Sequence, residues 1–219
     1  MGVSLWETCP QLALLDPGVG YTYFEHFFNY VAADWAVTEI GAAGSEVLQD
    51  AAGGVLLITT DALDNDGVQI QKLGEAFIPA AGKPLWFETR IRLVTAAKHV
   101  ESDLLVGLAI TDTTVIPGRT DGIYFAKADG SALVGAVTEK ASAATTTAGV
   151  LTLAAATWYK FGFFCDGVST CYLYVDGVLV ATHTTNIPIV ELTPTFAVLN
   201  GEAGATAWAI DYFKAVQIT

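Results

Sequence analysis

The sequence predicts an all-β protein: an antiparallel two-sheet β-sandwich of jelly-roll type with an extended N-terminal arm. Apolar and polar residues alternate in many short runs, which recur about every 8–12 residues and are separated by Asp-Gly or Asn-Gly pairs. No stretch shows the periodicity of an amphipathic helix. Of 219 residues, 53% are hydrophobic and 15% are charged, so the chain is expected to fold around a large core.

The segment 158–182, WYKFGFFCDGVSTCYLYVDGVLVAT, contains the clearest strand pattern. If Cys165 lies opposite Cys171, the loop DGVST joins two strands, and the core-facing side chains of both strands fall on one face. A shift by one residue would separate those side chains, so the alternation favours this register. The second Asp-Gly pair supplies the positive-φ residue of a further tight turn. The segment therefore predicts a three-stranded meander.

Further strands are expected along the rest of the chain. They are 54–60, 67–73, 85–94, 104–111, 122–128, 131–137, 149–154, 194–200 and 207–218. The segment 139–149, EKASAATTTAG, has low complexity and is interpreted as a long mobile loop. A chain of this length accommodates about twelve to fourteen strands, too many for one open sheet. We therefore expect one sandwich domain, residues 21–219, preceded by an arm, residues 1–20.

The charge distribution is uneven. The net charge is −13, and the first basic residue is Lys72, whereas residues 1–71 contain ten Asp and Glu. Nucleic acid is therefore excluded as a partner, because phosphate contacts need Lys and Arg. The chain has no apolar run of membrane-spanning length and no basic n-region of a signal peptide, so neither membrane insertion nor secretion is expected.

The three cysteines are Cys9, Cys165 and Cys171. This number is small and odd, which does not suggest a disulfide framework. Cys165 and Cys171 are expected to be core-facing free thiols, with a cross-strand disulfide left as the alternative. The absence of an Asn-x-Ser/Thr sequon agrees with synthesis in a reducing host cytoplasm.

The order of motifs in the C-terminal half resembles a known fold. A strand W-Y-K-F-G-F-F is followed by Y-L-Y-V-D-G-V, a loop with N-I-P, P-T-F-A-V-L-N-G and a final strand containing D-Y-F. This order is similar to that of the concanavalin A-like lectin/glucanase fold, and more narrowly to virion proteins of tailed bacteriophages that use this jelly roll. The resemblance covers roughly residues 24–218 and implies a structural role in a virion.

No catalytic site, cofactor or metal site is predicted. Glucanases of this fold carry E-x-D-x-E or E-x-D-x-x-E on one strand, whereas here Glu101 and Asp103 lack the third acid and are expected to lie in a loop. The segment DALDNDG, 61–67, departs from the calcium-loop pattern and is interpreted as an acidic turn. The three histidines, His26, His99 and His183, are expected at the surface or at strand ends.

Aromatic residues are the remaining candidates for a binding site, because sugar rings stack on exposed Trp and Tyr. Most are expected in the core, but Tyr172 and Tyr174 share the face opposite Leu173 and are candidates for a contact surface. The candidates are Trp35, Trp86, Trp158, Trp208, Tyr172 and Tyr174. An exposed aromatic groove beside acidic or amide side chains would favour a glycan binder.

The leading hypothesis is a capsid decoration or cement protein, not an enzyme, on the exterior of the virion. Its expected partners are the major capsid protein or another virion protein and further copies of itself, with a trimer favoured by shell symmetry. The alternative is a carbohydrate-binding module of a phage tail or head fibre, with a glycan as ligand. Candidate assembly contacts are apolar residues of the arm, namely Leu5, Trp6, Leu12, Leu14 and Leu15.

Overall fold

Alternating side chains along 15 strands build two stacked antiparallel sheets in the computed structural model, which describes residues 18–219. Sheet A consists of β1 (Gly20–Glu25), β3 (Ser45–Gln49), β4 (Val55–Thr59), β6 (Leu85–Leu93), β11 (Trp158–Cys165), β12 (Cys171–Val175), β13 (Val178–His183) and β15 (Ala207–Ile218). Sheet B consists of β2 (Trp35–Ile40), β5 (Gly67–Lys72), β7 (Ser102–Ala109), β8 (Gly122–Lys127), β9 (Leu133–Lys140), β10 (Ala143–Thr152) and β14 (Thr193–Asn200). The predicted two-sheet β-sandwich is confirmed.

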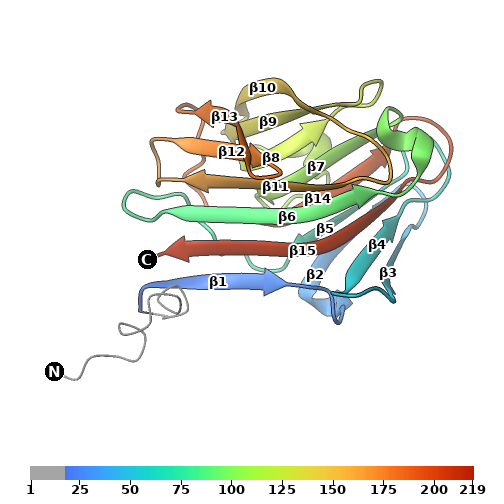
Figure 1. The fold of residues 1–219 in the computed structure, drawn as a ribbon, viewed down its shortest axis with the longest axis horizontal. Helices are drawn as coiled ribbons and strands as arrows, with labels where there is room; N and C mark the ends of the chain where they lie inside the picture. The colour runs from blue at the N-terminus through green and yellow to red at the C-terminus, as the bar shows by residue number, and fades with distance from the viewer. Residues whose placement is uncertain (1–17) are drawn as a thin grey trace.

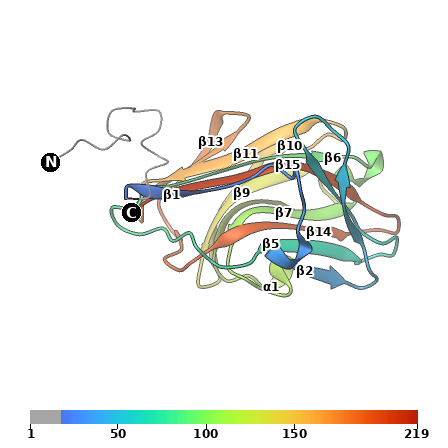
Figure 2. The same cartoon turned by 90° about the horizontal axis from the view of Figure 1, so that it is seen from below.

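The strand order brings distant parts of the chain together. Sheet A runs β13-β12-β11-β6-β15-β4-β3, and β1 pairs with β15 beside β4, as Figure 1 shows. Sheet B runs β10-β9-β8-β7-β14-β5-β2. The two sheets form separate layers in Figure 2. The central strands β6 and β15 are therefore neighbours although more than a hundred residues separate them.

The core lies between the sheets because each strand of sheet A turns one side chain in two toward sheet B. In β6, the residues Leu85, Phe87, Thr89, Ile91 and Leu93 are buried, and the residues that alternate with them face outward. Trp208 of β15 and Phe196 of β14 meet across the two layers with ring centroids 6.0 Å apart. The apolar alternation seen in the sequence is thus the signature of this core.

The predicted three-stranded meander is confirmed. It consists of β11, β12 and β13 and forms one edge of sheet A. Cys165 lies opposite Cys171, and Phe163 lies opposite Leu173, so the loop comprises residues 166–170. The turn between β12 and β13 has positive φ at Asp176 (50°) and Gly177 (80°), as the Asp-Gly pair indicates. Local sequence therefore determines both the register and the turn of this segment.

The prediction of a long loop at 139–149 is wrong. This segment forms the end of β9 and most of β10, which pair from Lys140 opposite Ala143 onward. Ala141 and Ser142 make the turn with φ values of 48° and 64°. Threonine favours strands because its branched side chain packs well on a pleated surface, so low complexity here does not mean disorder.

Helical structure is limited to short segments of the connections. They are α1 (Val115–Gly118) and the 3-10 turns η2 (Ala32–Asp34) and η3 (Ala96–His99). Figure 2 shows α1 on the side of sheet B that faces away from sheet A. Val115 of α1 packs there with Leu105, Tyr124 and Val137 in a small second core.

The start of the described chain belongs to the sandwich. Strand β1 begins at Gly20, inside the segment expected to be an arm, and pairs with β15 from Gly20 opposite Ile218 to Glu25 opposite Phe213. Residues 1–17 of the predicted arm, which include the five candidate assembly contacts, lie outside the described residues.

Candidate functional site

The outer face of sheet A, the face turned away from the core, carries an ordered row of aromatic side chains. Trp86 of β6, Phe164 of β11 and Tyr172 of β12 are cross-strand partners in adjacent strands. The Trp86 and Phe164 rings lie 4.8 Å apart at 25°, and the Phe164 and Tyr172 rings lie 5.9 Å apart at 7°. These three residues are called the aromatic row. The aromatic row offers a stacked apolar surface to solvent, since the Trp86 residue is 38% exposed.

The next transverse row of the same face contains a gap. Lys214, Glu88, Gly162 and Tyr174 are successive cross-strand partners on β15, β6, β11 and β12. Because Gly162 has no side chain, the surface is hollowed between its neighbours. The resulting hollow, of about 450 Å³, is called the Gly162 hollow. Trp86 and Phe164 form its aromatic wall, and Tyr174 and Lys160 also line it.

One carboxylate in the Gly162 hollow is held in place. The Tyr212 hydroxyl donates a hydrogen bond of 2.5 Å to Glu88 Oε1. Burial raises the pKa of the Tyr212 phenol, and the hydrogen bond to Glu88 raises it further, so the phenol stays protonated and keeps donating. The second oxygen of Glu88 is then oriented as an acceptor at the edge of the hollow.

Basic side chains border the hollow on β6. The guanidinium groups of Arg90 and Arg92 lie 4.5 Å and 4.8 Å from the ring centroid of Trp158. Arg90 also donates to Asp211 Oδ2 at 2.7 Å, which fixes its position. Such cation–π contacts hold both guanidinium groups at the Trp158 ring, and neither arginine lines the hollow.

The outer face of sheet B holds a second, smaller hollow of about 290 Å³, lined in part by Asp103, Ile116, Arg119 and Lys127. Lys127 Nζ donates to the Ser102 carbonyl oxygen, and burial lowers the pKa of this ammonium to about 8. Its lysine is thus turned toward backbone carbonyls, and Arg119 is paired with Glu139 at 3.2 Å, so both basic side chains of this hollow have partners within the protein.

The segment that carries α1 covers the middle of this second face. Two buried amides of β5 hold it. Gln69 Oε1 accepts from the Val115 amide at 3.0 Å, and Gln71 donates to the Ile110 carbonyl oxygen at 2.9 Å while accepting from the Asp112 amide at 2.9 Å. These contacts give the face a structural role, which leaves sheet A as the face with the open site.

The two acids compared with a glucanase motif have separate partners. Glu101 lies 3.4 Å from Lys98 Nζ in an ion pair. Asp103 accepts the Asp129 amide at 3.0 Å and lies on β7, not in the loop expected from the sequence. Strand β7 begins earlier than predicted because Ser102 is buried and donates to the Lys98 carbonyl oxygen at 2.8 Å.

The acidic turn 61–67 is organised by backbone contacts. Asp66 accepts hydrogen bonds from the amides of Ala42 and Leu63, each at 3.2 Å. Residues 18–219 contain no group of three or more His, Cys, Asp or Glu side chains placed to hold a metal ion. Within the same residues, no helix is long and apolar enough to cross a membrane.

The histidines have different surroundings. His26 lies between the rings of Phe24 and Phe28, at 4.1 Å and 5.3 Å, and His99 contacts the Ala96 carbonyl oxygen at 2.9 Å. His183 is the last residue of β13, which agrees with the predicted strand-end position, and its side chain is buried. The reason is that β13 ends against β9 and β10, whose Thr138 and Thr147 hydroxyls contact its two ring nitrogens.

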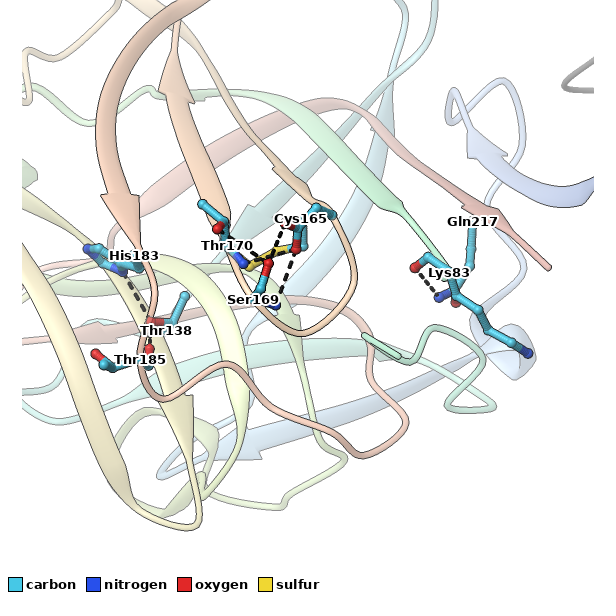
Figure 3. Close-up of a disulfide and its surroundings, with 10 residues drawn as sticks. Lys83, Thr138, Cys165, Ser169, Thr170, His183, Thr185 and Gln217 are labelled. Carbon is cyan, nitrogen blue, oxygen red and sulfur yellow. Dashed lines mark hydrogen bonds between the residues drawn. A yellow bond between two sulfur atoms is a disulfide. The ribbon is translucent and has the colours of Figure 1, made fainter. Parts of the chain in front are cut away.

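The prediction of free thiols at Cys165 and Cys171 is corrected by the structure, which joins them in a disulfide (Figure 3). The two residues are directly opposed in register, the geometry that a cross-strand disulfide needs. The loop that follows Cys165 is closed further by Asp166, which accepts hydrogen bonds from the amides of Ser169 and Thr170. The end of the hairpin is therefore covalently fixed.

The aromatic candidates divide between core and surface. Trp35 and Trp208 are buried, whereas Trp86 and Trp158 lie on the outer face of sheet A. The predicted contact face of Tyr172 and Tyr174 is the face of the Gly162 hollow. Sequence reasoning missed Phe164, Gly162 and the polar residues opposite them. The alternation in 85–94 marks Glu88 as outward-facing, but pairing of β6 with β11 is needed to place it at the site.

Solved structures with this fold include proteins that act on or recognise carbohydrate. The endo-1,3-beta-glucanase from Streptomyces sioyaensis is 16% identical with a TM-score of 0.66, and the match covers 90% of this chain and 95% of the glucanase. The carbohydrate recognition domain of Emp46p is 9% identical with a TM-score of 0.57, covering 87% and 94%. These similarities confirm the concanavalin A-like lectin/glucanase jelly roll. No curated protein matches this chain.

The glucanase neighbour corrects the prediction that this chain is not an enzyme. That exclusion rests on the absence of a complete linear catalytic motif, of which Glu101 and Asp103 are the nearest approach. A linear motif is a weak criterion, because carboxylates of a sandwich can converge from separate strands, and enzymes share this fold. The exclusion of catalysis is therefore not retained.

One solved structure and one protein family match most of the sandwich. A protein of unknown function, SO2946 from Shewanella oneidensis MR-1, is 16% identical with a TM-score of 0.64, covering 100% of this chain and 96% of that protein. Neither it nor the neighbours above are described as virion proteins. The family model "SO2946-like, C-terminal domain" matches residues 52–211, which include β4 to β14 and the start of β15. The chain therefore belongs to the SO2946-like family.

Proposed function

We propose that this protein binds carbohydrate at the Gly162 hollow on the outer face of sheet A. The observation that carries the proposal is the arrangement of Trp86 and Phe164 as a stacked wall beside Glu88, Lys160 and Lys214. A pyranose ring presents an apolar face and a rim of hydroxyl groups. The aromatic wall fits the apolar face, and the polar side chains fit the rim.

The size and shape of the hollow support the proposal. A volume of about 450 Å³ lies within the range of small-molecule sites in proteins. The aromatic row continues from the hollow to Tyr172, so an extended saccharide has a second stacking position across the sheet. Glu88, already oriented by Tyr212, is placed to accept a hydrogen bond from a sugar hydroxyl.

The fold similarity adds support. A glucanase and a carbohydrate recognition domain have the same architecture over most of this chain. At these identities the similarity concerns the fold, so the binding face is argued from this chain's own residues.

The virion role expected from the sequence stays a prediction. Its capsid partner, its trimer and its place on the capsid exterior depend on the arm residues from Leu5 to Leu15, which lie outside the described residues. The aromatic groove beside acidic and basic side chains is the feature that favours the glycan alternative over the decoration role.

The test is binding of purified protein to a polysaccharide panel, measured by affinity electrophoresis and calorimetry. The panel contains laminarin, lichenan, polygalacturonate and dextran sulfate. Trp86→Ala and Phe164→Ala are expected to weaken binding at least tenfold. The matched control is Leu133→Ala, since Leu133 is 52% exposed on sheet B. The proposal is rejected if the wild-type protein binds no member of the panel, or if both aromatic variants bind as the wild type does.

A further inference from the structure

The basic residues of this acidic protein gather on the face that carries the Gly162 hollow. The whole chain has 10 Lys and Arg against 23 Asp and Glu. Four of those basic residues lie on the outer face of the adjacent strands β15, β6 and β11, which contain only two acids, Glu88 and Asp211. The four are Arg90, Arg92, Lys160 and Lys214. The local excess of positive charge is the reverse of the overall balance.

Both acids on these strands are engaged within the face. Glu88 accepts the Tyr212 hydroxyl, and Asp211 is paired with Arg90. The nearest turn supplies Asp176, whose carboxylate accepts the backbone amide of Lys160 at 2.8 Å. Among residues 18–219, no ion pair within 4 Å joins Lys160 Nζ or Lys214 Nζ to a carboxylate. Two ammonium groups are therefore left unpaired at the hollow.

The positions of these two lysines connect the charge to the site. Lys214 is the cross-strand partner of Glu88, which is in turn the partner of Gly162. Lys160 precedes Gly162 by two residues on β11. The side chains of Lys160 and Lys214 both line the hollow. A ring stacked on Trp86 and Phe164 thus has an ammonium group available at two positions.

The donors and acceptors of the hollow favour negative charge on the ligand. Lysine side chains only donate hydrogen bonds, and of the two oxygens of the one carboxylate in the lining, Oε1 already accepts from Tyr212. No Asn, Gln or Asp side chain lines the hollow, although these residues read sugar hydroxyls with paired donors and acceptors. A ligand with its own anionic groups satisfies both lysines.

We propose that the saccharide bound at the Gly162 hollow is anionic, carrying carboxylate or sulfate groups that Lys160 and Lys214 contact. This inference rests on the proposed carbohydrate-binding function and specifies its ligand class. The ring stacks on the aromatic row, and the acidic groups face the two lysines. Because both ammonium groups are exposed, their attraction to the ligand is screened by salt.

The experiment compares charged and neutral forms of the same polymers. Polygalacturonate is measured beside its fully methyl-esterified form, and dextran sulfate is measured beside dextran, with the wild-type protein at 50 and 300 mM NaCl. We expect at least tenfold tighter binding of the charged member of one pair, with affinity falling at the higher salt concentration. The pair that shows the difference identifies carboxylate or sulfate as the anionic group.

Two double variants test whether binding depends on the lysines of the hollow or on the general attraction between opposite charges. Lys160→Gln with Lys214→Gln is expected to weaken binding of the charged polymer at least tenfold and to flatten its salt dependence. The control, Lys83→Gln with Lys140→Gln, makes the same change in net charge away from the hollow and is expected to change affinity less than twofold. An equal loss in both double variants would show general attraction and overturn the inference.

The outcomes also distinguish this inference from the proposed function. If neutral and charged polymers bind equally and only Trp86→Ala reduces binding, the carbohydrate site stands and its anionic specificity is wrong. If no polymer binds, both proposals fail. If the charged polymer binds and Trp86→Ala has no effect while the lysine variant does, the site recognises charge without stacking a sugar ring, and the proposed function fails.

Discussion

Cys165 and Cys171 are joined by a disulfide directly beneath the aromatic row, since each is the sequence neighbour of an aromatic residue on the opposite face. Phe164 precedes Cys165 on β11, and Tyr172 follows Cys171 on β12. The bond therefore fixes, from the core side, the two strands that present the Phe164 and Tyr172 rings. Stacking of these rings at 5.9 Å and 7° is consistent with a rigid hairpin end.

Removing this disulfide should destabilise the protein. Cys165→Ala with Cys171→Ala is expected to lower the free energy of unfolding by about 2 kcal/mol, because the bond closes a short loop in the unfolded chain. Urea denaturation measures the change. Thiol alkylation of the denatured wild-type protein should label Cys9 alone, and three labelled thiols without added reductant would contradict the bond.

The two faces of the same hairpin should respond differently to truncation. Phe163 is 3% exposed and stacks on Phe87 with centroids 5.4 Å apart, so Phe163→Ala should cost about 3–5 kcal/mol. Phe164 lies on the outer face, so Phe164→Ala should lower the free energy of unfolding by about 1.5 kcal/mol or less. Thermal melts of both variants test this difference. Similar melting temperatures for the two would show that the hairpin is not part of the core framework.

Acid should weaken the contact between β13 and sheet B. Burial lowers the pKa of His183, whose Nδ1 contacts Thr138 Oγ1 at 3.1 Å and whose Nε2 contacts Thr147 Oγ1 at 3.0 Å. Thr138 Oγ1 donates to the Thr185 carbonyl oxygen, so it accepts from Nδ1–H, and Nε2 is left to accept from Thr147. This network, part of which Figure 3 shows, suits the neutral ring.

The sign of the pH effect follows from this lowered pKa. The unfolded chain takes up a proton near the ordinary histidine value of about 6.5, whereas the folded protein resists protonation until lower pH. Stability should therefore be full above about pH 6.5 and fall as the pH decreases toward the lowered folded value. Denaturation between pH 5 and 8 measures the slope. His183→Gln should reduce that slope, whereas the control His99→Gln should keep it.

Asn200 should be among the least replaceable polar residues. Its side chain is fully buried, donates to the carbonyl oxygens of Asp61 and Leu63 at 2.7 and 2.9 Å, and accepts from the hydroxyls of Thr60 and Thr206 at 2.9 and 2.7 Å. Asn200→Ala leaves these buried groups without partners and should cost at least about 3 kcal/mol.

A matched amide provides the control for that prediction. Asn186 donates one side-chain hydrogen bond, to Thr145 Oγ1 at 3.0 Å, and is only partly buried. Asn186→Ala should therefore cost about 1–2 kcal/mol, since one hydrogen bond is lost and the φ of 54° suits Asn better than Ala. Equal effects of the two changes in urea denaturation would refute the central role of Asn200.

Several features of this protein follow from the sequence by itself. Period-two alternation predicts the strands, the outward direction of Glu88 and the shared face of Tyr172 and Tyr174, because successive side chains of a strand point to opposite sides. The register of Cys165 with Cys171 and the turn at Asp176 also follow locally, since a slip by one residue would expose the core-facing side chains.

Other features were decided only by the tertiary structure. The Gly162 hollow requires β11 to pair with β6 and β6 to pair with β15, and that strand order depends on crossovers that no local pattern encodes. Burial of His183 depends on β9 and β10 reaching the end of β13, and those strands include the segment that low complexity suggested was a loop. Alternation specifies which way a side chain points from its strand, whereas the neighbours it meets there are chosen by long-range packing of the two sheets.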